Sequence, residues 1–154
     1  MEMQKIKSFQ VDHTKLDRGM YISRIDGDII TYDIRMKKPN SEAVLENAAL
    51  HTIEHLFATF VRSSRLSANI VYFGPMGCRT GFYFITRGIS HLKAIGLAKE
   101  ALEFIAGFKG KIPGAALKEC GNYLEHDIEG AKCEAIKFLV VMARVTEKTL
   151  EYKS

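Results

Sequence analysis

The chain combines short segments rich in β-branched and aromatic residues with longer segments of helical character. The short segments occur as two pairs, and turn-forming residues separate the members of each pair. In the first pair the separator is Asp26-Gly27, a dipeptide suited to a tight hairpin. In the second pair it is a short loop that contains glycine and proline. The pattern therefore predicts two hairpins, with strands at residues 20–25, 28–36, 69–73 and 81–86.

Three further segments have the composition or spacing of helices. The first follows Pro39, where Asn40 or Ser41 can cap a strong helix-forming run. The second carries apolar residues at helical spacing, and the glycine-punctuated residues 109–124 separate it from the third. We expect helices from about 40 to 62, 90 to 108 and 127 to 145. Because the strands form hairpins without βαβ alternation, the expected fold is one α+β domain over residues 1–154, a small antiparallel sheet packed against helices.

Composition narrows the class of protein. With 154 residues, 47% apolar and 26% charged, the chain suits one globular domain. The formal net charge is only +4 and the basic residues do not cluster, so nucleic acid is not an expected partner. No apolar run approaches the ~20 residues that span a bilayer, and the N-terminus lacks the apolar region of a signal peptide. Three cysteines without Cys-x-x-Cys pairing fit a reducing compartment, so we expect a cytoplasmic protein.

The most informative segment is the H-x-x-E-H pattern of His51, Glu54 and His55, inside the first expected helix. At about 3.6 residues per turn, the three side chains project into an arc of roughly 100°. We expect this face to point into the protein, where two neutral imidazoles make half of a tetrahedral metal site. Satisfied core histidines, or a hydrogen-bonded helix pair, would show the same spacing. The pattern also occurs in zinc peptidases that use the glutamate as general base and a distant carboxylate as ligand, but those enzymes are normally far larger.

The three cysteines differ in what their surroundings allow. Cys120 ends a glycine-punctuated loop, from which a thiolate can approach an ion closely. It is a candidate third ligand, with a buried inert thiol as the alternative. Cys78 lies in a tight loop beside Arg79, and a nearby cation favours the thiolate. Cys78 is therefore a candidate nucleophile or base, although a turn cysteine of no consequence fits equally well. Cys133 looks like a packing residue of the third helix.

Taken together, these segments resemble the S-ribosylhomocysteine lyase (LuxS) family, whose members make the precursor of autoinducer-2. The order and spacing of the matching motifs carry the resemblance more than any single one of them. The motifs are Ser8-Phe9-Gln10-Val11-Asp12-His13, Tyr32-Asp33-Ile34-Arg35, His51-Thr52-Ile53-Glu54-His55-Leu56, Gly74-Pro75-Met76-Gly77-Cys78-Arg79-Thr80-Gly81, Glu119-Cys120-Gly121-Asn122-Tyr123 and His126-Asp127-Ile128-Glu129-Gly130-Ala131-Lys132.

The resemblance implies a small α+β homodimer with its active sites at the subunit interface. It implies one divalent ion per subunit, iron(II) in the native enzyme with zinc or cobalt as substitutes. The implied reaction converts S-ribosylhomocysteine to homocysteine and 4,5-dihydroxy-2,3-pentanedione, a step of quorum sensing and of the activated methyl cycle. By resemblance, the metal ligands are His51, His55 and Cys120, the acid/base residues are Cys78 and Glu54, and the substrate-binding residues are Ser8, His13 and Arg35.

The implied chemistry needs such residues, because each stage removes a proton from a carbon beside a carbonyl. Aldose–ketose isomerisation moves the carbonyl along the ribose chain, and β-elimination then expels homocysteine. We expect Cys78 to carry the carbon protons and Glu54 the oxygen protons, with an open metal position acting as Lewis acid. Two other classes stay possible at this point. One is a zinc-dependent hydrolase of the H-x-x-E-H type, with a carboxylate ligand instead of Cys120. The other is a non-catalytic module with four protein ligands.

Overall fold

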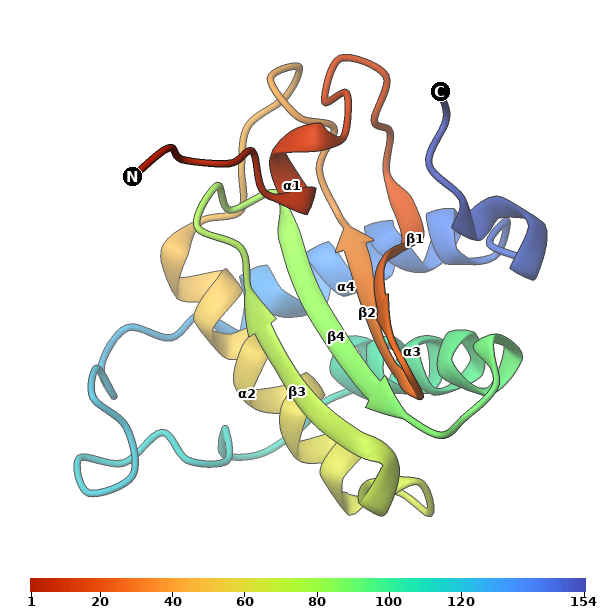
Figure 1. The fold of residues 1–154 in the computed structure, drawn as a ribbon. Coiled ribbons are helices and arrows are strands. Elements are labelled where there is room, and N and C mark those ends of the chain that lie inside the picture. The colour runs from red at the N-terminus through yellow and green to blue at the C-terminus, as the bar shows by residue number, and fades with distance from the viewer.

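Two hairpins form one four-stranded antiparallel sheet in the computed structural model, which describes residues 1–154 (Figure 1). The first hairpin turns at Gly27-Asp28, where Gly27 has the positive φ of 63° that a type II′ turn needs. The last strand of the second hairpin pairs with the second strand of the first hairpin, which joins the two hairpins. The sheet order is β1-β2-β4-β3, with bounds Gly19–Asp26 for β1, Ile29–Arg35 for β2, Ile70–Pro75 for β3 and Gly81–Arg87 for β4.

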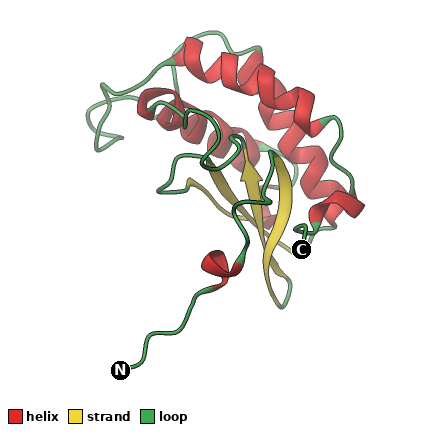
Figure 2. Cartoon of the chain, turned by 90° about the horizontal axis from the view of Figure 1, so that it is seen from above, coloured by secondary structure: helices red, strands yellow, loops and turns green.

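Three long helices cover one face of the sheet, and the two chain ends lie on the other face (Figure 2). Helices α3 and α4 pack on each other and on α2, which also packs on β3. The helices are α1 (Lys7–Gln10), α2 (Asn47–Ser63), α3 (His91–Ala106) and α4 (Ile128–Met142), with 3-10 turns at Ser67–Asn69 and Glu147–Leu150. None of them combines the length and the apolar character that crossing a bilayer requires.

Alternation along the central strands divides their side chains between the two faces of the sheet. Tyr32 and Ile34 of β2 belong to the hydrophobic core under the helices. Asp33 and Arg35 of the same strand therefore face the opposite side. They are nevertheless only 1% and 4% exposed, because the chain ends cover them. A charged pair is thus buried on the face of the sheet that carries no helix.

Both hairpins and the second and third predicted helices are confirmed to within a few residues. The caps follow the sequence: Ser90 accepts a hydrogen bond from the Lys93 N–H, and Asp127 accepts one from the Gly130 N–H. The predicted α+β class, with an antiparallel sheet against helices, is also confirmed. The short α1 was not predicted, because its few residues carry no periodic pattern.

The predicted start of the first helix was wrong, since α2 begins at Asn47 and residues 40–46 are irregular. Contacts with other segments fix this stretch. The Glu42 carboxylate pairs with Arg18 at 2.7 Å and accepts a hydrogen bond from the Lys38 N–H. The Leu45 N–H donates to the carbonyl of Arg79, in the β3–β4 loop. These tertiary contacts outweigh the helix preference of the residues.

Strand β4 begins at Gly81, where the backbone of β2 lies too close for a side chain. Gly81→Ala tests that constraint. A Cβ there would lie 2.1 Å from the carbonyl oxygen of Ile34, on the paired strand β2. Backbone cannot give way cheaply, so we expect a loss of about 3 kcal/mol and a fall in Tm of about 5–10 °C. Calorimetry measures both. Gly96→Ala is the matched control: a Cβ there meets nothing within 4 Å inside α3, so Tm should rise slightly.

Candidate metal centre and active site

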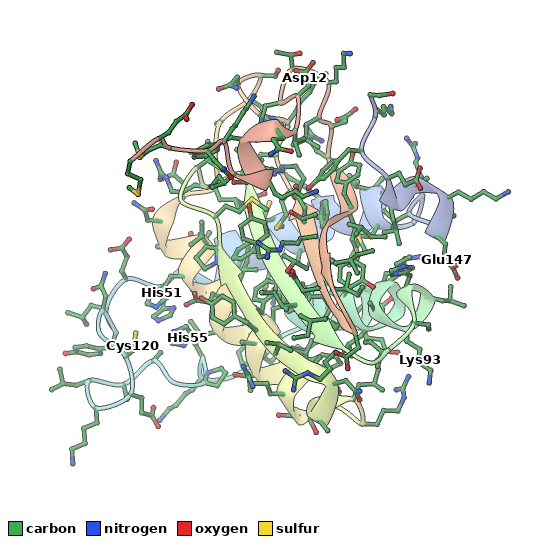
Figure 3. All side chains as sticks on the ribbon, viewed as in Figure 1. Asp12, His51, His55, Lys93, Cys120 and Glu147 are labelled. Atoms are coloured by element: carbon green, nitrogen blue, oxygen red, sulfur yellow. The ribbon has the colours of Figure 1, made fainter.

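His51 and His55 project from one flank of α2 toward the long loop that joins α3 to α4 (Figure 3). The Nδ1 atom of His51 lies 2.8 Å from the carbonyl oxygen of Glu125, and the Nδ1 atom of His55 lies 2.8 Å from that of Pro113. A carbonyl oxygen only accepts, so each Nδ1 carries the proton and donates. Each Nε2 therefore keeps a free lone pair, the arrangement that prepares a histidine to bind a metal ion.

The thiol of Cys120 meets these two nitrogens. Its Sγ atom lies 3.3 Å from Nε2 of His51 and 3.8 Å from Nε2 of His55. The loop reaches this position through Gly114, whose φ of 71° is left-handed and whose hydrogen faces the His55 ring, where a Cβ would lie 3.2 Å from Nδ1. The structure thus brings together the three predicted ligands. Their role in binding an ion stays a prediction.

A fourth donor, which the sequence interpretation did not assign, is His126. Its Nδ1 lies 3.0 Å from Oγ1 of Thr52, and the Thr52 hydroxyl already donates to the carbonyl of Ala48. His126 must therefore donate from Nδ1, which leaves a lone pair on Nε2, and that atom is buried without a partner. Burial lowers the pKa of His126 to about 4, helped by His51 and His55, so the ring is neutral at pH 7. The four donor atoms lie within 4.8 Å of one another.

This donor set suits a divalent cation of borderline softness. Imidazole nitrogen and thiolate sulfur are ordinary zinc ligands, and iron(II) and cobalt(II) accept the same types. The buried, unpartnered Nε2 of His126 is the kind of atom that a nearby cation would satisfy. The cluster contains no carboxylate, which is the ligand that an H-x-x-E-H peptidase would need.

The histidine face was expected to point into the protein, and in this respect the prediction was wrong. His51, Glu54 and His55 are only half-buried, whereas Ile53 and Leu56 fill the core. The three side chains lie on the flank of α2, and the loop after α3 covers part of that flank. The hydrophobic periodicity of α2 does not indicate that a loop covers this flank. Glu54 lines an open hollow of about 400 Å³ together with His55.

Cys78 lies in a different hollow, of about 230 Å³, on the face of the sheet that carries the chain ends. All three predicted substrate-binding residues line it as well, and neither Glu54 nor any of the four clustered donors does. The Cys78 side chain is exposed to solvent. The residues around this hollow are Ser8, Phe9, Val11, His13, Ser23, Asp33, Arg35, Met76, Cys78, Tyr83 and Tyr152.

The Asp33–Arg35 pair forms the floor of this hollow. The guanidinium donates from Nε and Nη2 to the two carboxylate oxygens, at 3.1 and 2.6 Å. Burial alone would lower the pKa of Arg35, but the charge and hydrogen bonds of Asp33 raise it above its ordinary value. Tyr152 donates to the same carboxylate at 2.7 Å. The sequence interpretation assigned no role to Asp33 or Tyr152, whose contact joins residues 119 positions apart.

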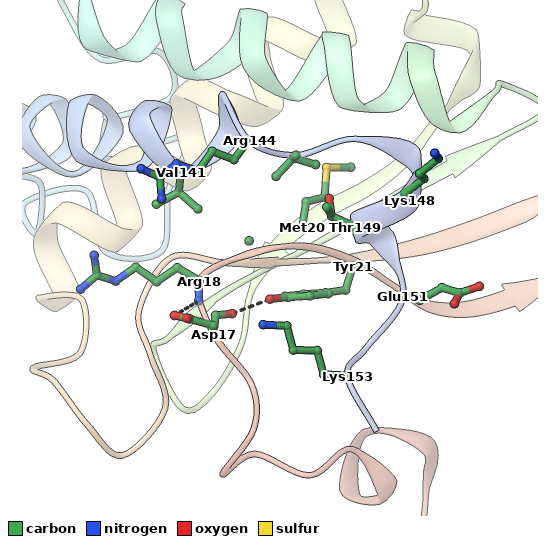
Figure 4. A pocket seen from close by; sticks show the side chains of 12 residues that line it. Asp17, Arg18, Met20, Tyr21, Val141, Arg144, Lys148, Thr149, Glu151 and Lys153 are labelled. Carbon is green, nitrogen blue, oxygen red and sulfur yellow. Dashed lines mark hydrogen bonds between the residues drawn. The ribbon is translucent and has the colours of Figure 1, made fainter.

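A hollow of about 510 Å³, larger than those of Glu54 and Cys78, contains none of the predicted site residues (Figure 4). It lies between the start of β1 and the C-terminal 3-10 turn. Asp17, Arg18 and Lys148 are among the charged residues that line it. Size therefore does not mark the candidate site in this chain, and the donor geometry does.

A family model described as S-Ribosylhomocysteinase (LuxS) matches residues 6–149. Similar curated proteins carry the name S-ribosylhomocysteine lyase. The protein from Borreliella afzelii is 50% identical over 156 residues, which cover 97% of this chain and 99% of the relative. The protein from Desulfotalea psychrophila is 48% identical and covers 99% of this chain and 100% of its own length. The protein from Clostridium acetobutylicum is 47% identical, with 97% and 99% covered.

Cys120→Ala tests the metal centre directly. Removing the only sulfur of the cluster should weaken metal binding about tenfold or more, and it should abolish the sulfur-to-metal charge-transfer absorption of the cobalt(II)-loaded protein. Metal analysis and absorption spectra measure the two effects. Cys133→Ala is the matched control, since this thiol lies on α4 outside the cluster; it is exposed, so the prediction of a packing residue was wrong. An unchanged spectrum in Cys120→Ala would show that the thiol is not a ligand.

Proposed function

This chain belongs to the S-ribosylhomocysteinase (LuxS) family, and on that premise we propose that it cleaves S-ribosylhomocysteine. The products are homocysteine and 4,5-dihydroxy-2,3-pentanedione, formed by aldose–ketose isomerisation and β-elimination within one domain of residues 1–154. The observation that carries the proposal is the position of the Cys120 thiol beside the Nε2 atoms of His51 and His55, whose lone pairs are free. These three residues belong to the family motifs and could together bind a metal ion. The reaction belongs to the cytoplasm, to autoinducer synthesis in quorum sensing and to the activated methyl cycle.

His51, His55 and Cys120 would hold one divalent ion per subunit, with iron(II) as the native ion and zinc or cobalt as substitutes. When bound, the ion supplies Lewis acidity to the oxygens of the substrate. His126 is a fourth donor in reach of the same place. Four protein ligands would favour a closed, structural site, so turnover and metal content have to be measured together.

The protein supplies two proton carriers. Cys78, as thiolate, takes a proton from a carbon beside the carbonyl and returns it to the neighbouring carbon, which moves the carbonyl along the chain. Glu54 moves protons between the substrate oxygens and assists the final step. In that step a proton leaves the carbon beside the carbonyl, and the sulfur of homocysteine leaves the next carbon with its bonding electrons.

Ser8, His13 and Arg35 bind the substrate in this proposal, since they share the hollow of Cys78. The His13 ring is held by a hydrogen bond of 2.9 Å between Nδ1 and the carbonyl of Val11. The Arg35 guanidinium is committed to Asp33, so it offers a fixed positive charge rather than a mobile anchor.

The separation of the two hollows supports a homodimer with active sites at the interface. Cys78 and Glu54 have to act on one substrate molecule, yet they line different hollows of one chain. A second copy that docks on the exposed face can bring its Cys78 hollow to the metal centre of the first. Large aromatic side chains stand at both hollows, Phe9 at 65% exposure and Tyr72 at 51%, as expected of a surface that a protein partner covers. Neither nucleic acid nor a membrane is a partner in this proposal.

Cys78→Ala and Glu54→Gln test the two proton carriers. Each variant should keep the metal ion, because neither side chain belongs to the donor cluster. Each should lose turnover by about a hundredfold or more, since proton transfer then lacks its carrier. An anaerobic assay of thiol release from S-ribosylhomocysteine, on iron(II)- or cobalt(II)-loaded protein, measures turnover. If the unmodified loaded protein released no thiol, the lyase assignment itself would be wrong.

Mixed dimers test whether one site draws on two subunits. A dimer of one Cys78→Ala chain and one Glu54→Gln chain has one site with both residues intact if the site is shared, and no intact site otherwise. Co-expressing the two variants should therefore restore about a quarter of the wild-type turnover, because half of the dimers are mixed and each has one working site. Each variant expressed alone is the control. A mixture as inactive as its components would contradict the shared site.

A further inference from the structure

A continuous path of hydrogen bonds runs from the C-terminal segment to Cys78. Tyr152 donates to Asp33, and Asp33 accepts two hydrogen bonds from Arg35. The remaining guanidinium nitrogen, Nη1, donates to Oγ1 of Thr80 at 2.8 Å. Oγ1 of Thr80 lies 3.1 Å from Sγ of Cys78, whereas Nη1 of Arg35 is 3.9 Å from the same sulfur. Of these two groups, the hydroxyl is therefore the closer to the thiol.

The direction of these hydrogen bonds follows from their donors. An N–H of Arg35 occupies one lone pair of the Thr80 oxygen, and a thiolate at Cys78 has no proton to donate, so the hydroxyl donates to the sulfur whenever Cys78 is ionised. A thiolate accepts this proton well, because hydrogen bonds to a charged acceptor are the strong ones. At the other end of the path, burial first and then the Asp33 charge raise the pKa of Tyr152 above its ordinary value, so its hydroxyl stays protonated and donates.

The residues in the middle of the path are buried, whereas Cys78 at its end is exposed to solvent. Asp33, Arg35 and Thr80 are 1%, 4% and 5% exposed, while Cys78 is open to solvent. Hydrogen bonds in a buried network strengthen one another, because the local dielectric constant is low. The aromatic ring of Tyr152 stacks on Tyr21 at 5.1 Å between centroids, which fixes the outer end of the path.

We propose that Thr80 and Tyr152 are positioning residues for Cys78: the Thr80 hydroxyl donates to the thiolate, and Tyr152 holds the Asp33–Arg35 pair that aims this hydroxyl. The proposal deepens the proposed function, since it takes Cys78 as the carbon-proton carrier. Neither residue needs to touch the substrate to act. Each acts by favouring the ionised thiol over the neutral one. The titratable and charged groups that share the hollow of Cys78 are His13 from the N-terminal segment, Asp33 and Arg35 from β2, Tyr83 from β4 and Tyr152 from the C-terminal segment. The neighbouring Arg79 instead donates from Nη1 to the carbonyl of Leu45.

Alkylation by iodoacetamide reports the thiolate fraction without any substrate, so the test does not depend on lyase activity. The metal-loaded, full-length protein is used, and peptide mass spectrometry separates Cys78 from the other two cysteines. At about pH 6.5, Thr80→Val should slow the alkylation of Cys78 about fivefold, and Tyr152→Phe about twofold. At about pH 10, above the range in which thiols ordinarily ionise, the rates should converge with that of the wild type.

Two controls separate this role from a structural one. Thr80→Ser keeps the hydroxyl and should restore the wild-type rate. Thr86→Val removes the hydroxyl of another buried threonine, on β4 and outside the hollow of Cys78, and it should not change the rate. Slowing by the same factor at both pH values would indicate altered access and would overturn the proposal. Wild-type rates in Thr80→Val would overturn it as well, and so would failure of the serine variant to rescue, whether or not Cys78→Ala abolishes turnover.

Discussion

Two main-chain carbonyls decide what α2 can do. Those of Pro113 and Glu125 each accept from the Nδ1 of one histidine, and this turns both Nε2 lone pairs toward Cys120. Without these hydrogen bonds, either ring could adopt the other tautomer, and the site would have no fixed set of donors. The irregular loop therefore does more than connect two helices. It supplies the thiol and sets the protonation state of its partners, so loop and helix form one unit.

The rest of the fold separates this unit from a second one on the same chain, the hollow of Cys78 with its Asp33–Arg35 pair. The helices pack on one face of the sheet, and the α2 flank that carries the histidines lies at the margin of that layer. The Asp33–Arg35 pair occupies the opposite face, under the chain ends. One strand thus contributes Tyr32 to the core and a buried charge pair to the hollow by simple alternation. In the proposed homodimer a second copy would bring the two units together, and the exposed aromatic residues at both hollows are consistent with that proposal.

Hydrophobic and turn patterns predicted most of the fold, because hairpins and amphipathic helices are local. They failed at residues 40–46, where Glu42 and Leu45 are bound by partners far away in sequence. The same division applies to the site. The spacing of His51 and His55 is local and could be read directly, whereas Cys120 needed the family resemblance. His126 escaped even that, because its significance depends on a hydrogen bond to Thr52, 74 residues earlier, which leaves its Nε2 without a partner.

The hollow around Cys78 shows a further reason why sequence patterns do not predict a site. Its walls come from both ends of the chain, with Ser8 and His13 at one end and Tyr152 at the other, while its floor comes from the central strand β2. The ends have no periodicity to read, and only the sheet brings them together. The hydrogen bonds to Asp33 fix the position of the charged Arg35 guanidinium, and the two chain ends cover it. The thiol itself stands at the exposed rim, which is where a proton carrier must be if its substrate arrives between two subunits.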